Sequence, residues 1–281
     1  MGVVVNGVEV VFVNFEELQL DCTFPYLILV NSLIPALLAG NTAILKPSSQ
    51  TPLVASRIVE IFATAGLPPN VLQVLHCATP ALLTSIITQL PSIALVTYVG
   101  STSGGLSLRA AAAAAAGQIV PVVLELGGND PAYVRGDAGN DVAWVAAQVV
   151  DGAVFNAGQS CCAVERVYVH ADVHDAFVAA VRKELAGIYV RPTVLVDVPP
   201  DARVMREETF GLVVPIARVE SDEEAVALMN DSVYGLTASV WTKDVRAGEE
   251  LVEKIEAGTI FVNRCDYPSP LKSYHIKETE A

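Results

Sequence analysis

The sequence predicts an α/β fold with a doubly wound parallel sheet and a second, smaller α/β domain. Apolar stretches of strand length alternate with stretches of helix length through most of the 281 residues. Alternation of this regularity builds βαβ units, whose crossovers are right-handed. Glycine or proline follows many of these stretches, as expected where helices and strands end. Because no internal repeat or flexible linker is found, the two domains are expected to follow each other directly.

The first domain is expected over residues 1–127. Residues 1–20 alternate valine with polar residues around Asn6-Gly7, a pair that favours a hairpin turn. Thr51 and Pro52 are expected as the N-cap and the first residue of a helix, and a later run of alanines is a strong helix former. The expected helices cover residues 25–39, 51–65, 80–89 and 106–116, and the expected strands cover 42–46, 71–75, 93–99 and 121–126.

The second domain is expected over residues 128–262, with residues 263–281 as a separate tail. Its strand and helix signals continue the alternation of the first domain, and Pro199-Pro200 stops one of the strands. The expected helices cover residues 141–153, 173–186, 222–230 and 245–257, and the expected strands cover 166–170, 191–198, 210–219, 236–241 and 258–263.

Composition argues against several classes of protein. The net charge of −14 argues against a basic surface for nucleic acid or for anionic membranes. The longest apolar run, residues 26–40, contains Asn31 and Pro35 and is too short to cross a bilayer. It is expected as a buried helix. Five cysteines without paired spacing, and no secretory signal, favour a reducing compartment and hence the cytoplasm.

Two adjacent thiols, Cys161 and Cys162, follow a small polar loop that contains Gly158 and precede an apolar alternating strand. A thiol in such a place is held by a rigid element and is open to a cleft, as a nucleophile needs. The alternative is that both are small core residues, because cysteine is often buried and its reactivity depends on its surroundings. The cysteines alone favour that alternative.

A carboxylate upstream favours catalysis instead. Glu125 is the single acid in an apolar strand that ends in Gly127-Gly128. A buried carboxylate is costly unless it has a partner or a task. A thiol and a carboxylate, each at a junction of strand and loop, indicate a nucleophile and a general base.

In this order and spacing, Glu125-Leu126-Gly127-Gly128 and Gly158-Gln159-Ser160-Cys161 resemble the aldehyde dehydrogenase superfamily. The family's Glu-Leu-Gly-Gly segment carries the general base, and its Gly-Gln-x-Cys loop carries the nucleophile. The resemblance therefore implies Cys161, not Cys162, as the nucleophile and Glu125 as the base. It also implies a Rossmann-like domain for the cofactor, followed by a catalytic domain that carries the thiol loop.

The same resemblance implies NAD or NADP as the cofactor. Residues 100–105, Gly-Ser-Thr-Ser-Gly-Gly, stand between a strand and a helix, where N–H groups attract phosphate, and match the family's pyrophosphate turn. Lys46 belongs to a Lys-Pro-Ser motif that contacts the adenosine ribose. Residues 207–211 are similar to a segment whose second glutamate holds the nicotinamide ribose. Alone, each feature also has a structural explanation: a tight turn, a strand-end charge and a helix cap. The implied cofactor residues are Lys46, Ser48, Gly100, Ser101, Gly127, Glu208 and Phe210.

The chain departs from the family pattern in several places. Family members are longer, and their N-terminal part, a stretch between Ala186 and Arg191, and a glycine-rich segment after Asp266 have no counterpart here. Thr23 stands where the family has an asparagine that stabilises the oxyanion, and a hydroxyl is a shorter donor than an amide. Residues 263–281 are similar only to the family's last, oligomer-forming strand. We expect a shortened, partly degenerate member whose homo-oligomer is weakened.

Two functions are compatible with these residues. The first is NAD(P)-dependent oxidation of a small aldehyde to the carboxylic acid, through a thiohemiacetal and a thioester on Cys161, with Glu125 activating water. The second is a catalytically impaired pseudoenzyme with a binding or regulatory role, which Thr23 and the missing segments favour. A hydrolase without cofactor is a weaker third. No metal site is expected, because His170 ends a strand and His174 begins a helix.

Overall fold

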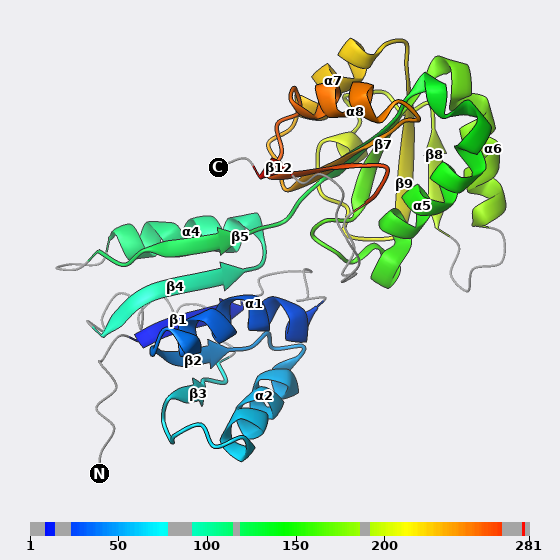
Figure 1. Ribbon diagram of the computed structural model, residues 1–281. Helices are drawn as coiled ribbons and strands as arrows, with labels where there is room; N and C mark the ends of the chain where they lie inside the picture. The colour runs from blue at the N-terminus through cyan, green and yellow to red at the C-terminus, as the bar shows by residue number, and fades with distance from the viewer. Residues whose placement is uncertain are drawn as a thin grey trace. The chain divides into compact units, whose positions relative to one another are not determined.

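The computed structural model describes residues 9–14, 24–77, 92–114, 119–185, 192–265 and 277–278. The chain divides into two compact units, residues 1–126 and 127–281. Both contain a parallel sheet with helices (Figure 1), which confirms the predicted fold class. The second unit is the longer one, contrary to the prediction of a smaller second domain. Its sheet also includes a strand that begins with Asp130 and Pro131, two residue types depleted in strands, which the sequence pattern did not indicate.

The first unit has a five-stranded parallel sheet in the order β3-β2-β1-β4-β5. This is the order found in doubly wound folds that bind dinucleotides. Its strands are β1 (Glu9–Asn14), β2 (Thr42–Lys46), β3 (Leu72–Val74), β4 (Ile93–Val99) and β5 (Val122–Glu125). Its helices are α1 (Pro25–Leu38), α2 (Pro52–Thr64) and α4 (Thr102–Ala113).

Helices cover both faces of this sheet, because successive side chains of a strand point to opposite faces. Ala43 and Leu45 of β2 pack in one core cluster with Leu33 of α1 and with α2. On the other face, Val96 of β4 packs in a second cluster with Leu108 of α4. Both clusters are buried, so the unit has a hydrophobic core on each side of the sheet.

Helix ends in the first unit depend on local caps. Helix α4 begins four residues before the predicted helix, because the Ser101 hydroxyl accepts a hydrogen bond from Gly104 N–H at 3.2 Å and caps it. Thr51 precedes α2 as predicted, but its side chain makes no capping hydrogen bond. The predicted turn at Asn6-Gly7 and the predicted helix over 80–89 lie outside the described residues.

The apolar run at 26–40 forms α1, which is only partly buried. Leu33 is buried, whereas half of Tyr26 and Leu27 and 83% of Leu38 are exposed. The prediction of a buried helix was therefore wrong in degree, because α1 packs through one side on its sheet. Within the described ranges, no helix has the length and apolar character needed to cross a membrane.

The second unit has a seven-stranded sheet in the order β12-β11-β10-β6-β7-β9-β8, in which only β12 is antiparallel to its neighbour. Its first strands are β6 (Asp130–Val134), β7 (Val164–His170), β8 (Thr193–Val196) and β9 (Val213–Val219). Strands β10 (Thr237–Trp241), β11 (Thr259–Val262) and β12 (Lys277–Glu278) complete it. The helices are α5 (Val142–Val154), α6 (Ala171–Glu184), α7 (Asp222–Asn230) and α8 (Val245–Val252).

Helices α5 and α6 cover one face of this sheet, and α7 and α8 cover the other (Figure 1). Strand β7 shows the alternation: Val167 and Val169 pack on the α5–α6 side, and Tyr168 packs on the α7–α8 side. Trp241, buried at the end of β10, meets Trp144 of α5 edge to face, with ring centroids 5.8 Å apart. The predicted doubly wound arrangement is thus present in this unit also.

Candidate functional site

The thiol loop, residues 155–162, connects α5 to β7. Asn156, Ala157 and Gly158 have φ values of 51°, 62° and 72°, three consecutive residues in the left-handed region. That conformation costs energy for a residue with a β-carbon, more for Ala157 than for Asn156, and persists where the surroundings fix it. The loop is therefore held in shape by its neighbours and not by local preference.

Both thiols of the loop are partly exposed, and neither forms a disulfide. The Cys162 sulfur lies 3.2 Å from the Ser160 hydroxyl. Cys265, by contrast, is buried against Gly152 and is an ordinary core thiol. Solvent exposure therefore distinguishes Cys161 and Cys162 from Cys265 as candidate nucleophiles, but it does not indicate which of the two is the nucleophile.

The two glycines of the Glu-Leu-Gly-Gly motif pack directly against other predicted site residues of the second unit. A β-carbon on Gly127 would overlap the carboxylate of Glu208. A β-carbon on Gly128 would overlap the carbonyl oxygen of Cys161 and would lie 2.7 Å from Asp130 Oδ1. The Gly128 N–H also donates to Glu208 Oε1 at 3.2 Å. A side chain at position 128 would meet backbone, so glycine is required there, whereas a side chain at position 127 would have to displace the carboxylate of Glu208.

The thiol loop also contacts the segment that carries Glu208. A β-carbon on Gly158 would overlap the carbonyl oxygen of Gly211 and would lie 3.2 Å from the carbonyl oxygen of Ala153. Three motifs that are far apart in the sequence therefore meet in the second unit. They bring together Gly127, Cys161 and the segment that carries Glu208 and Phe210.

Two carboxyl groups of this region have a pKa above the usual value for glutamate. Burial raises the pKa of Glu208 to about 7, and the hydrogen bond from Gly128 N–H opposes the rise. Burial also raises the pKa of Glu165 to about 7. The N–H groups of Thr209 and Phe210 oppose that second rise, and the nearby charge of Glu208 adds to it. Both carboxyl groups therefore titrate near neutral pH, as carboxyl groups at functional sites often do.

Asp130, at the start of β6, is fully buried beside the loop. Burial raises the pKa of its carboxyl well above the usual range, and the charges of Cys162 and Glu165 add to the effect. The Thr237 hydroxyl opposes it by donating a hydrogen bond of 2.5 Å to Asp130 Oδ2. A carboxyl group so buried holds its proton more easily than an exposed one.

Arg166 of β7 links this strand to the start of β6 and to the end of α7. Its buried guanidinium donates to the carbonyl oxygens of Asn129 at 2.8 Å, Leu228 at 3.2 Å and Met229 at 3.2 Å. Sequence reasoning singled out neither Arg166 nor Glu165. The signal was present, because two adjacent charged residues stand in an apolar strand directly after the thiols, and buried charge needs a partner or a task.

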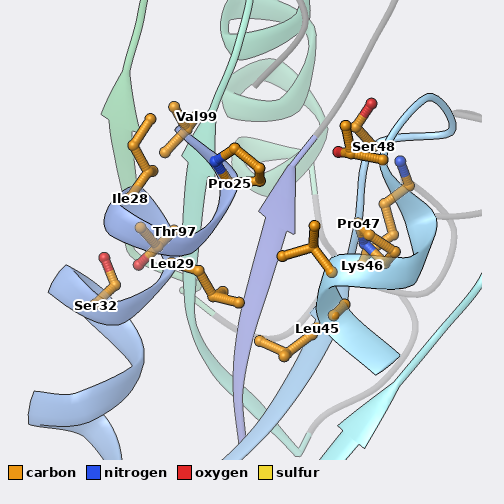
Figure 2. A pocket seen from close by; sticks show the side chains of 13 residues that line it. Pro25, Ile28, Leu29, Ser32, Leu45, Lys46, Pro47, Ser48, Thr97 and Val99 are labelled. Carbon is orange, nitrogen blue, oxygen red and sulfur yellow. The ribbon is translucent and has the colours of Figure 1, made fainter. Parts of the chain in front are cut away.

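In the first unit, Lys46 and Ser48 line a pocket at the end of β2 (Figure 2). Both side chains are buried, and the Ser48 hydroxyl accepts a hydrogen bond of 3.1 Å from Gln50 N–H. The remaining wall is mostly apolar and includes Pro25, Ile28, Leu29, Leu45, Pro47, Val54, Ala55 and Val99. Apolar walls with a few polar groups are typical of sites for small organic molecules.

The predicted pyrophosphate turn is joined to the strand that carries the predicted base. Gly100 N–H donates to the carbonyl oxygen of Glu125 at 3.0 Å, and Ser101 caps α4. Glu125 itself is exposed, so the expectation that it is buried was wrong. The reason is that Val122 and Leu124 pack on the α4 side of the edge strand β5, so Glu125 lies on the opposite face, where Val123 is exposed too. Desolvation nevertheless raises the pKa of the Glu125 carboxyl.

The predicted site residues are divided between the units. Lys46, Ser48, Gly100, Ser101 and Glu125 belong to the first unit, and Gly127, Cys161, Glu208 and Phe210 belong to the second. Thr23 lies outside the described residues. Within the described part of the chain, no three His, Cys, Asp or Glu side chains gather closely enough to hold a metal ion.

The chain is similar in sequence to known proteins. Residues 23–188 and 181–273 match the sequence pattern of the aldehyde dehydrogenase family. The 3,6-anhydro-α-L-galactose dehydrogenase of Streptomyces coelicolor is 32% identical, over 91% of this chain and 62% of its own length.

Solved structures are similar as well. The NADP-dependent glyceraldehyde-3-phosphate dehydrogenase of Bacillus halodurans, complexed with NADP, is 30% identical with a TM-score of 0.82, over 94% of this chain and 62% of that one. The aldehyde dehydrogenase of Mycobacterium tuberculosis, complexed with NAD+, is 30% identical with a TM-score of 0.83, over 95% and 64%. The chain thus spans about three fifths of the length of these relatives. It belongs to the aldehyde dehydrogenase family.

Proposed function

We propose that the chain oxidises a small aldehyde to the carboxylic acid with NAD or NADP. The observation that best supports this is the meeting of three motifs in the second unit, where Gly127 and Gly128 pack on Glu208 and on the thiol loop. The absence of a side chain at these two positions lets the Glu208 carboxylate and the thiol loop approach the backbone of the Glu-Leu-Gly-Gly motif closely. The similar solved structures include dehydrogenases complexed with NADP and with NAD+.

The residues fit a dinucleotide. Lys46 and Ser48 line a mostly apolar pocket, and the N-terminus of α4 follows Gly100, where N–H groups favour a phosphate. The Glu208 carboxylate is a suitable acceptor for ribose hydroxyls. When bound, the nicotinamide supplies a hydride acceptor. We assign Lys46 and Ser48 to the adenosine ribose, Gly100 and Ser101 to the pyrophosphate, and Gly127, Glu208 and Phe210 to the nicotinamide riboside.

Cys161 is the proposed nucleophile. Its thiolate adds to the aldehyde carbon and forms a C–S bond, and the carbonyl oxygen takes the negative charge of the thiohemiacetal. The N–H of Cys161 is the proposed donor to that oxyanion, with the Thr23 hydroxyl as a second donor. Loss of hydride from the same carbon leaves a thioester on Cys161.

Glu125 is the proposed general base for the second half of the reaction. Its carboxylate takes a proton from water, the hydroxide adds to the thioester carbon, and the C–S bond breaks to release the acid and the thiolate. Desolvation raises the pKa of the Glu125 carboxyl, which makes its carboxylate a stronger base than an ordinary glutamate. One aldehyde, one water and one oxidised dinucleotide give one acid, one reduced dinucleotide and a proton.

The alternative is a protein that binds a dinucleotide without turnover. Thr23, in place of an amide donor, favours it, because loss of one oxyanion donor costs about a hundred- to a thousand-fold in rate. One experiment separates the two functions. Formation of NADH or NADPH is followed with a panel of aliphatic and aromatic aldehydes, for the wild type and for Cys161→Ala, together with dinucleotide binding. Turnover that Cys161→Ala abolishes supports oxidation, and binding without turnover supports the alternative.

A further inference from the structure

Glu165 occupies an unusual place in β7, four residues after Cys161. Its side chain is only 3% exposed. Its two carboxylate oxygens accept one backbone hydrogen bond each, from Thr209 N–H and from Phe210 N–H, both at 2.7 Å. Hydrogen bonds to a charged acceptor are short and about twice as strong as neutral ones. Glu165 therefore binds the 209–210 turn from the interior of the sheet.

The turn that Glu165 binds is strained. Phe210 has a φ of 49°, a left-handed conformation that a bulky aromatic residue rarely adopts. Such a conformation persists only where the surroundings over-determine it. The two hydrogen bonds from consecutive N–H groups to one carboxylate supply that constraint, because they fix the orientation of both peptide planes around Thr209.

The same turn sets the direction of the Glu208 side chain. Glu208 directly precedes Thr209, and its carboxylate reaches Gly128 N–H at 3.2 Å in the space over Gly127. Arg166, the residue after Glu165, donates to backbone carbonyls elsewhere and not to this turn. If Glu165 released the two amides, Gly128 N–H would still donate to Glu208, but the backbone from which Glu208 and Phe210 project would lose both of these hydrogen bonds.

We propose that Glu165 is a positioning residue for the cofactor, which fixes the 209–210 turn so that Glu208 and Phe210 can contact the nicotinamide riboside. This inference rests on the proposed function, in which those two residues bind NAD or NADP. Glu165 touches neither the cofactor nor the substrate in this scheme. Its effect is transmitted through two backbone amides. We therefore expect substitution of Glu165 to change cofactor affinity more than the rate of the chemical step.

The test compares Glu165→Gln with Glu207→Gln. The first variant keeps the size of the side chain but has one acceptor oxygen for two N–H donors. The second makes the same chemical change at an exposed carboxylate, 57% exposed and ion-paired with Arg203, one residue before Glu208. Fluorescence titration with NADH and NADPH gives the dissociation constant, and steady-state rates give KM for the dinucleotide and kcat.

We expect Glu165→Gln to weaken dinucleotide binding about tenfold or more, the range for loss of a hydrogen bond to a charged group. KM for the dinucleotide should rise by a similar factor, with a smaller fall in kcat at saturation. Amide hydrogen exchange at Thr209 and Phe210 should become faster in this variant, with or without ligand. Glu207→Gln should leave all of these unchanged.

Several results would overturn the inference. Dinucleotide affinity equal to that of the wild type, or unchanged exchange at Thr209 and Phe210, would show that Glu165 positions nothing. A wild type that binds neither dinucleotide refutes the proposed function itself. Hydrogen exchange at the Thr209 and Phe210 amides then still tests whether Glu165 fixes the 209–210 turn. Should Glu165→Gln fail to fold, Glu165→Asp keeps the charge and shortens the side chain by one carbon. The same shifts, smaller in size, are then required.

Discussion

The carboxylate of Glu208 lies in the space that a β-carbon on Gly127 would fill. The obstacle is the far end of a flexible side chain, so a methyl group there would displace Glu208 at little cost in stability. We therefore expect Gly127→Ala to weaken NAD(H) binding about tenfold, by loss of charged hydrogen bonds to the ribose, with little change in melting temperature.

The matched control for this prediction is Gly139→Ala. A β-carbon on Gly139 would lie 3.7 Å from Val173, an ordinary contact, so the same chemical change meets no obstacle. Titration of both variants with NADH and thermal denaturation provide the measurements. A fall in affinity that Gly139→Ala shares would show that the effect is not specific to Glu208.

Gly158→Ala should behave differently from Gly127→Ala. Its φ is 72°, and the group that a β-carbon would meet is the backbone carbonyl of Gly211, which cannot turn aside. We expect a loss of about 1–3 kcal/mol in the free energy of unfolding, from strain and overlap together. Chemical denaturation of the two variants side by side checks this, and equal stabilities would contradict it.

The stability of the second unit should fall as pH rises through the weakly acidic range. The pKa of buried Glu165 is raised from 4.5 to about 7. Between these values the folded chain holds a proton that the unfolded chain has released, so the stabilising effect is complete below about 4.5 and is lost by about 7. For one such carboxyl the difference is at most about 3 kcal/mol.

Removal of the Glu165 carboxyl isolates this contribution. The raised pKa values of Glu208 and Asp130 act in the same direction, so the wild type and Glu165→Gln should both lose stability as pH rises. The loss should be smaller in the variant. The charge of Arg166 lowers the Glu165 pKa and so reduces the difference between the two proteins. Melting temperatures by calorimetry at about pH 5 and about pH 8 test this. Parallel curves would argue against a raised Glu165 pKa.

Cys161 should react faster than Cys162 with a mild alkylating agent near neutral pH. Both thiols are partly exposed, so a difference would reflect thiolate character, which a nucleophile needs and a structural cysteine does not. Mass spectrometry of the labelled peptide gives the ratio. Faster labelling of Cys162, or of Cys77, would remove the proposed nucleophile.

Neither dinucleotide should be strongly excluded. The residues after the Lys-Pro-Ser motif are Ser49 and Gln50, and neither carries a carboxylate that would repel a 2′-phosphate. We expect dissociation constants for NADH and NADPH that differ by less than about a hundredfold, or about 2.7 kcal/mol. Titration with each dinucleotide decides the matter, and a much larger preference for NADH would refute the expectation.

The parts of the fold that the sequence predicted well have strong local signals. Helix α7 spans the predicted residues, and its start is fixed by the Ser221 hydroxyl, which caps it by accepting from Glu224 N–H at 3.1 Å. Strand β6 was missed because Asp130 and Pro131 are tolerated there only through tertiary contacts, such as the hydrogen bond from Thr237. Local propensity does not contain that information.

The candidate site was only partly predictable for a similar reason. Resemblance to known motifs indicated Cys161 and Glu208, but the carboxylate of Glu165 accepts hydrogen bonds from backbone amides that are over forty residues away in the sequence. A single sequence gives no pairing of that range. Glu125 was expected to be buried because its neighbours are apolar, yet it lies on the face of the edge strand β5 opposite α4, where it is exposed.

Trp144 and Trp241 are the two tryptophans of the whole sequence, and both lie in the second unit. Their edge-to-face contact joins the end of β10 to α5, the helix that leads into the thiol loop. Tryptophan emission, excited selectively over tyrosine, therefore reports on the unit that carries the thiols and not on the unit that carries Lys46. If the two units melt independently, a heating curve recorded by tryptophan emission will have a different midpoint from one recorded by circular dichroism. The two tryptophans are thus a natural probe for the unfolding of the second unit alone.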